Sequence, residues 1–253
     1  MKSMPFEVIC EIEPPTRPDL VHVRHQIGVL GKIATQFLVP DNHIGRATVS
    51  SIAVAHEVEQ MGGRCIACLN ARDRNLLGFR RDLLTAAAYG VDQFLFVYGD
   101  RPVSGARTGQ LTVRSMIEEL RASPHGPFRV GVAAGPGPLP DWKRTADFVC
   151  AQVQFSLDGM LAWRENIEFD GPVYAGVIVV ASASMARKIA GDAPQLEVPS
   201  EWIDAIERDP SAGVDRACEL VLGLRDSGAF DGVHLIPVSK YREVAAYLER
   251  ALR

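Results

Sequence analysis

The sequence predicts an α/β fold in which eight parallel strands close into a single (β/α)8 TIM barrel. Short apolar runs alternate with segments of helical spacing along the chain, a repetition typical of parallel strands joined by crossover helices. The expected strands are apolar nearly throughout, as required when both faces of a sheet are covered. The length of 253 residues would allow two domains, but it matches the roughly 250 residues of one barrel. We therefore expect residues 1–253 to form one barrel domain.

The expected elements follow one another in a regular order. Strands are predicted at 6–10, 35–39, 64–69, 92–97, 128–134, 148–154, 173–180 and 232–237. Helices are predicted at 20–31, 48–61, 75–89, 113–122, 159–166, 201–208, 212–227 and 240–252. Gly62-Gly63 and Gly90 mark the ends of two helices, because glycine is preferred just after the last helical residue.

The crossover after the fifth strand is expected to be short. Its sequence begins GPGPLP, with Pro136, Pro138 and Pro140, and the remaining residues 141–147 allow at most two helical turns. An open doubly wound sheet is the competing architecture. It is less favoured because no glycine-rich phosphate-binding turn follows the first strand.

The composition is that of an ordinary globular protein, with 47% hydrophobic residues, 23% charged residues and a net charge of −4. Nucleic acid is not an expected partner, since there is no basic run and only 5 Tyr and 3 Trp could stack on bases. No apolar run reaches the roughly 18 residues of a membrane helix, and MKSMPFEVIC lacks the pattern of a signal peptide. We expect a cytoplasmic protein without a membrane partner, either a monomer or a small homo-oligomer.

The five cysteines are scattered and are expected to be buried thiols. Cys65 and Cys68 form a CxxC pair within an apolar run, but no second pair supplies the four ligands that structural zinc needs. The six histidines show no paired spacing. The sequence therefore predicts no metal site.

Polar residues follow nearly every expected strand. Functional residues of a barrel gather at the carboxyl ends of its strands. The residues at these positions include Glu11, Glu13, Asp41, Asn42, His43, Asn70, Asp73, Tyr98, Asp100, Gln152, Gln154, Ser182, Ser184 and Lys240. Their convergence on one end of the barrel favours an enzyme over a structural scaffold.

Two acids stand at the end of the first strand, in CEIEPP. Glu11 and Glu13 are two residues apart, so their side chains are expected on one face, and Pro14-Pro15 must end the strand. A glutamine at the end of a buried strand is unusual, and Gln152 is predicted to be buried and functional. Asp73 also suits a helix-capping position before residues 75–89, and Gly99-Asp100 also suits a plain turn.

Several motifs, in chain order, resemble those of the methylenetetrahydrofolate reductase family. Glu11-Ile12-Glu13-Pro14-Pro15 matches the family's Glu-x-x-Pro-Pro, and Gly99-Asp100-Arg101-Pro102 matches its Gly-Asp-x-Pro. Residues 68–75 (CLNARDRN) match His-Leu-Thr-Cys-Arg-Asp-Arg-Asn, and residues 151–156 (AQVQFS) match Thr-Gln-Phe-Phe-Phe-Asp. Residues 198–202 and 232–240 match Ile-Pro-x-Trp and Gly-x-His-Phe-Tyr-Thr-Leu-Asn-Arg more loosely. The resemblance covers almost the whole chain.

The resemblance implies reduction of 5,10-methylenetetrahydrofolate, with hydride passing from NAD(P)H through FAD. It implies that Glu11 is the acid that opens the imidazolidine ring, that Asp100 lies near the pterin, and that Gln152 hydrogen-bonds the pterin. A general acid must reach the leaving nitrogen, and an apolar setting or a like-charged neighbour such as Glu13 keeps it protonated. We expect Glu13, Asp73 and Gln154 to contact the substrate.

The departures from the family concern the flavin side. Cys68 replaces the family's flavin-binding His, Asn70 replaces a Thr, and Tyr98 replaces the residue before Gly-Asp. The helix that contacts the adenosine half of FAD would lie in the short crossover. Our hypothesis is a reductase without FAD, in which NADH lies against the pterin and donates hydride directly. Asn42, Asn70 and Tyr98 are then the expected cofactor-binding residues.

Three alternatives remain open. The chain resembles a family of FAD-dependent reductases, and it could use FAD through unusual contacts. It could also be a folate-binding protein without catalysis, or act on another pterin that carries one-carbon units. NADH is preferred over NADPH because no arginine cluster for a 2′-phosphate is identifiable.

Overall fold

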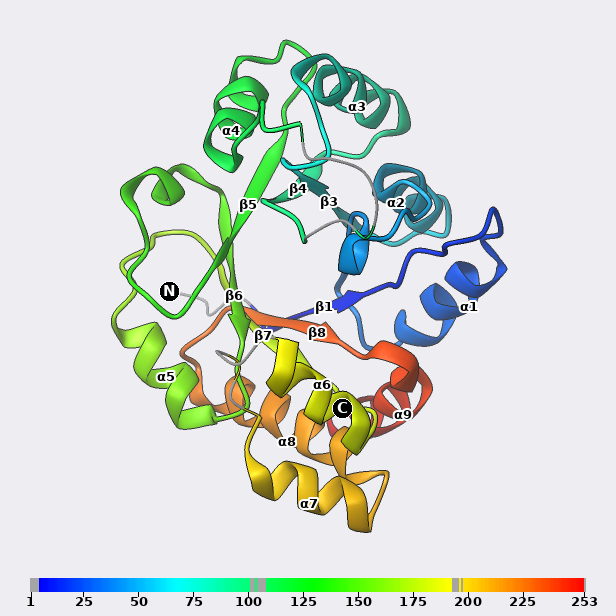
Figure 1. Ribbon diagram of the computed structural model, residues 1–253, viewed down its shortest axis with the longest axis vertical. Helices are drawn as coiled ribbons and strands as arrows, with labels where there is room; N and C mark the ends of the chain where they lie inside the picture. Colours follow the sequence, from blue (N-terminus) through cyan, green and yellow to red (C-terminus); the bar gives the residue numbers. More distant parts are fainter. Residues whose placement is uncertain (1–4, 101–102, 104–107, 193–195, 197, 253) are drawn as a thin grey trace.

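Eight parallel strands close into a barrel in chain order in this computed structural model, which describes residues 5–100, 103, 108–192, 196 and 198–252 (Figure 1). The strands are β1 (Glu7–Glu11), β2 (Gln36–Val39), β3 (Cys65–Asn70), β4 (Gln93–Val97), β5 (Arg129–Ala134), β6 (Phe148–Val153), β7 (Val173–Ile178) and β8 (Gly232–Ile236). Each strand pairs in parallel with the next, and β8 pairs with β1. The predicted α/β barrel is confirmed.

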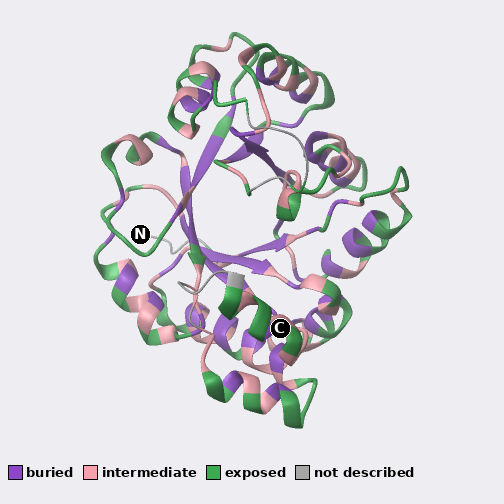
Figure 2. Ribbon diagram, in the orientation of Figure 1, coloured by how far each residue is buried: buried purple, intermediate pink, exposed green. Residues whose placement is uncertain are grey.

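The helices lie around the outside of the strands (Figure 1). They are α1 (Val21–Leu30), α2 (Ser51–Gln60), α3 (Leu76–Tyr89), α4 (Val113–Ala122), α5 (Leu157–Glu165), α6 (Ala183–Asp192), α7 (Ser200–Arg208), α8 (Ala212–Ser227) and α9 (Tyr241–Ala251). The large buried cluster joins their inner faces to the outer faces of the strands. Buried residues accordingly follow the strands and the inward helix faces (Figure 2).

The inside of the barrel is filled by side chains from several strands. Ile9, Leu38, Ile66, Cys68, Leu95, Phe148, Cys150 and Tyr174 form one buried cluster. The rings of Phe148 and Tyr174 meet edge to face, with centroids 5.9 Å apart. Gly131 on β5 makes room for the Phe148 ring, because a Cβ at position 131 would lie 2.1 Å from a carbon of that ring. The barrel is therefore a packed core, open only at its ends.

The crossover after β5 is short, as predicted. A 3-10 segment, η2 (Asp141–Thr145), is its one helical element, and the prolines before it cannot donate backbone hydrogen bonds. Lys143 donates from Nζ to the Ala133 carbonyl at 2.5 Å, and Trp163 of α5 donates from Nε1 to the Gly135 carbonyl at 3.0 Å. Burial lowers the pKa of Lys143. These side-chain hydrogen bonds satisfy backbone carbonyl groups at the end of β5.

One helix was not predicted from the sequence. α6 begins after Ser182, whose Oγ accepts a hydrogen bond from the Met185 amide at 3.2 Å. Met185 and Ile189 stand four residues apart, the spacing of one helix face. The helical signal was present but overlooked: these two apolar residues recur at helical spacing within a run of otherwise small and charged residues.

The five cysteines are free and buried, as predicted. Within the described ranges, no helix is long and apolar enough to cross a membrane.

Candidate active site

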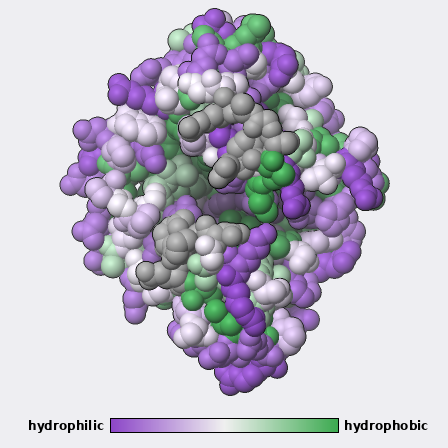
Figure 3. Space-filling model, in the orientation of Figure 1, coloured by the Kyte–Doolittle hydropathy of each residue, from purple (hydrophilic) through white to green (hydrophobic). Residues whose placement is uncertain are grey.

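A cavity of about 620 Å³ opens at the carboxyl ends of the strands. We call it the mouth cavity. Its polar lining comes from Glu11, Glu13, Gln26, His43, Asp100 and Lys188. Its apolar lining includes Ile44, Ile178, Met185, Ile189, Leu196 and Ile236. Figure 3 shows the molecule hollowed at this end, with hydrophobic surface beside the hollow. Such an apolar cavity with a few converging polar groups is the usual form of a small-molecule site.

Glu11 stands at the end of β1 and is held by a histidine from the neighbouring strand. His234 on β8 places its Nε2 3.1 Å from Oε2 of Glu11, and the side chains are only 11% and 13% exposed. The pairing of β8 with β1 brings the two residues together. A carboxyl group with a histidine partner at the base of an apolar cavity is arranged to hold and transfer a proton.

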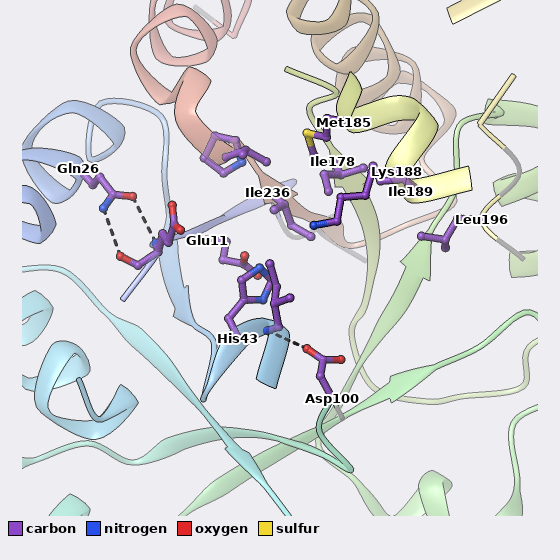
Figure 4. Close-up of a pocket in the computed structure, with 14 residues that line it drawn as sticks. Glu11, Gln26, His43, Asp100, Ile178, Met185, Lys188, Ile189, Leu196 and Ile236 are labelled. Carbon is purple, nitrogen blue, oxygen red and sulfur yellow. Dashed lines mark hydrogen bonds between the residues drawn. The ribbon is translucent and has the colours of Figure 1, made fainter. Parts of the chain in front are cut away.

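Glu13 lies at the edge of the same cavity, just after the strand. Its backbone is clamped by Gln26 of α1, which is 1% exposed. The Glu13 amide donates to Oε1 of Gln26 at 3.3 Å, and Nε2 of Gln26 donates to the Glu13 carbonyl at 3.4 Å (Figure 4). Both acids therefore line one cavity, as the two-residue spacing predicted, although β1 itself ends at Glu11.

Asp100 is positioned beside a strained turn. Its Oδ2 accepts a hydrogen bond from the Ile44 amide at 3.0 Å (Figure 4). Ile44 has φ 56° and ψ 30°, and Val238, in the loop after β8, has φ 51°. Both are β-branched residues in the left-handed region, where a Cβ branch is costly, and both line the mouth cavity. Backbone strain of this kind gathers at functional sites.

A network of charged and amide side chains closes the ends of β2 and β3. Asn70 is completely buried. Its Nδ2 donates to Asp41 at 2.6 Å, and its Oδ1 accepts from the Asp73 amide at 2.9 Å. Arg74 bonds both Asp41 and Asp82. Gly99 must be glycine here, because its φ is +97° and a Cβ would lie 2.8 Å from Cβ of Asn70.

This network changes the interpretation of two predicted ligand residues. Asn70 was expected to bind the cofactor, but it is enclosed and its amide is already bonded, so it supports the loops around it. Asp73 was expected to contact the substrate. It accepts hydrogen bonds from Arg72 at 3.1 Å and from Asn42 at 3.2 Å and does not line the mouth cavity. The capping position before α3 belongs to Asn75, which accepts from the Gly78 amide at 2.7 Å.

The other predicted residues, at or just after the ends of β4 and β6, do not line the mouth cavity. Gln152 is exposed, so the prediction that it is buried is wrong. It follows Phe148 and Cys150, whose side chains lie in the barrel interior, and it stands where the pairing of β6 with β7 shifts register, between Cys150 and Val153. Gln154 lines a separate cavity beside α5 with Trp163. Tyr98 lines another, beside Lys143, and is 48% exposed.

Sequence reasoning missed four residues at the site. His234, Gln26 and Lys188 were not proposed, and His43 was expected only to be exposed, which it is. His234 stands in the closing motif of residues 232–240. It is two residues from Ile236 on β8 and so shares its face, which would have placed His234 inside the barrel. No local signal marks Gln26 or Lys188. Across the described residues, no group of three acidic, histidine or cysteine side chains is suited to hold a metal ion.

Comparison with known families agrees with the motifs. The family described as methylenetetrahydrofolate reductase matches residues 11–251. The chain belongs to this family. The match begins at Glu11 and includes every predicted site residue. Among curated proteins, no sequence matches significantly.

Solved structures show the same fold at low identity. An uncharacterized protein from Clostridium thermocellum, reported to bind two copies of 5-methyl-5,6,7,8-tetrahydrofolic acid, is similar over 98% of this chain and 97% of its own, with 10% identity and a TM-score of 0.65. Two other structures are also similar. The spore cortex-lytic enzyme SleL of Bacillus cereus has 10% identity and a TM-score of 0.54, over 97% of this chain and 75% of its own. A GH18 chitinase of Pseudoalteromonas aurantia has 12% identity and a TM-score of 0.50, over 97% of this chain and 99% of its own. At these identities the likeness concerns the barrel alone.

Proposed function

We propose that this protein reduces 5,10-methylenetetrahydrofolate to 5-methyltetrahydrofolate, with NADH as a direct hydride donor. The family supports a folate substrate. The Clostridium thermocellum protein, which binds 5-methyltetrahydrofolate on the same fold, is consistent with this substrate class. The observation that carries the proposal is the enclosed Glu11–His234 pair at the base of an apolar cavity.

The proposed reaction begins with a proton from the Glu11 carboxyl group. The proton passes to N10 of the folate, the bond between N10 and the methylene carbon breaks, and an iminium forms at N5. Hydride from the nicotinamide then adds to the methylene carbon, giving the methyl group and NAD⁺. His234 orients Glu11 toward the cavity, and the resulting carboxylate stabilises the cation. One proton and one hydride are consumed in each turnover.

The residues at the family's flavin positions support direct transfer. Cys68 lies within the barrel core and is 5% exposed, and Asn70 is completely buried with its amide bonded. Neither offers a free group to a flavin ring, so these positions do not fit FAD. An iminium carbon is electrophilic enough to accept hydride from a nicotinamide without an intermediate carrier. Asn42 and Tyr98 remain the residues proposed to contact NADH, and Glu13 remains a residue proposed to contact the substrate.

The decisive experiment is an anaerobic assay of NADH oxidation with methylenetetrahydrofolate. We expect turnover by protein without flavin absorbance, and no increase when FAD is added. A purified protein with stoichiometric FAD absorbance, or activity only with added FAD, would instead support a conventional flavoenzyme.

A variant of the proposed acid distinguishes a catalyst from a protein that only binds folate. Glu11→Gln should lower turnover by about 10²- to 10⁴-fold, the usual contribution of a general acid, with folate affinity within about threefold of the original. If the original protein binds folate but neither it nor the variant turns over, the protein is a folate-binding protein without catalysis. Equal turnover by both would refute Glu11 as the acid.

A further inference from the structure

The two sides of the mouth cavity differ in charge. Glu11, Glu13 and Asp100 line it from the ends of β1 and β4. Lys188 lines it from α6, on the opposite side, and its ammonium points into the cavity (Figure 4). The cavity thus presents carboxylates to one part of a ligand and a cation to another.

Lys188 has no ion-pair partner within the described part of the chain. Its neighbour Arg187 differs, because it points away from the cavity lining and bonds Glu207 of α7 at 2.5 Å. An exposed lysine on a helix is ordinary, but this one stands among apolar side chains at a ligand cavity. Met185 and Ile189, one turn apart on the same helix, flank it, and Ile178 and Ile236, at the ends of β7 and β8, lie close by (Figure 4).

We propose that Lys188 recognises the terminal glutamate carboxylates of the folate, an assignment that rests on the proposed function. A reduced folate has three parts in line: a pterin rich in N–H donors, an aromatic aminobenzoyl group, and a glutamate with two carboxylates. The acidic side of the cavity suits the first, the isoleucine and methionine side chains suit the second, and Lys188 suits the third. A carboxylate paired with an ammonium makes a charge-assisted hydrogen bond.

The pyrophosphate of NADH is the competing anion. It is flanked on both sides by ribose hydroxyls, which require polar partners. The surroundings of Lys188 on α6 and at the end of β7 are aliphatic, and they match the aminobenzoyl group that precedes the glutamate. The structure therefore favours the carboxylates of folate.

The test compares Lys188→Met, which keeps an unbranched apolar side chain but removes the charge, with the control Arg187→Met. Dissociation constants are measured by calorimetry for 5-methyltetrahydrofolate, for its derivative with both glutamate carboxylates amidated, and for NADH. We expect Lys188→Met to weaken binding of 5-methyltetrahydrofolate by about 5- to 10-fold, just below the range for hydrogen bonds between charged groups, because the site is exposed. Binding of the diamide and of NADH should not change, and Arg187→Met should behave like the original protein.

Three results would overturn the assignment. An unchanged folate affinity in Lys188→Met would show that the ammonium does not contact the glutamate. An equal loss for the diamide would show that the side chain acts by packing. A loss confined to NADH would assign Lys188 to the pyrophosphate. If the original protein binds none of the folates, the proposed function itself is refuted. This outcome is distinct from the three results above, in each of which the original protein binds folate.

Discussion

Removal of the His234 side chain should lower catalysis far more than folate binding. The perturbation is His234→Leu, which keeps an apolar side chain of moderate size but removes the group 3.1 Å from Oε2 of Glu11. Both partners are nearly nine-tenths enclosed. A hydrogen bond to a charged group in such a setting contributes about 1.5–3 kcal/mol.

This energy converts directly into a rate. If the hydrogen bond orients the acid in the transition state, its loss lowers kcat by about 10- to 150-fold, since each 1.36 kcal/mol is a factor of ten. His234 does not line the mouth cavity, so the KM for methylenetetrahydrofolate should stay within about threefold. The assay is steady-state NADH oxidation, with both parameters measured across the pH range of activity.

Two further variants test whether His234 acts through Glu11. His234→Gln retains an amide donor that can reach Glu11, and it should recover most of the lost kcat. His234→Leu combined with Glu11→Gln should be no slower than Glu11→Gln alone, because residues that act as a unit are non-additive. A kcat for His234→Leu within threefold of the original would refute the reasoning, as would an equal loss in His234→Gln.

Two further predictions concern strain and thiol reactivity. Ile44→Gly should not lower the free energy of unfolding and should raise it by up to about 1 kcal/mol, because glycine relieves the left-handed strain of a residue that is 53% exposed. The KM for folate should rise, because Ile44 lines the mouth cavity. The control Ile44→Val keeps the strain and should leave the free energy of unfolding unchanged. A loss of more than about 1 kcal/mol in denaturant unfolding would contradict this. Burial raises the pKa of all five thiols, with Cys150 and Cys218 at about 12, so iodoacetamide at pH 8 should label none in the folded protein and all five after unfolding, as mass spectrometry would detect.

Much of the architecture was predictable because its signals are local. Apolar strand runs, glycine stops and the prolines after β5 each act within a few residues. α6 was missed although its apolar residues Met185 and Ile189 recur at helical spacing. The burial of Gln152 was predicted wrongly: it lies at the end of β6, where the register against β7 shifts, and its side chain is exposed.

The sequence by itself determined the barrel, the strand ends at which polar residues gather, and the family motif that contains Glu11. Tertiary structure alone decided which of those residues meet. Closure of β8 against β1 brings His234 to Glu11 across 223 residues. The pairing of β2 with β3 seats Asn70 between Asp41 and Asp73, and α6 brings Lys188 to the cavity opposite the acids. Hydrophobic periodicity reports which face a residue occupies, whereas the partner of a carboxylate depends on strands and helices distant in the chain, whose contacts only the closed barrel determines.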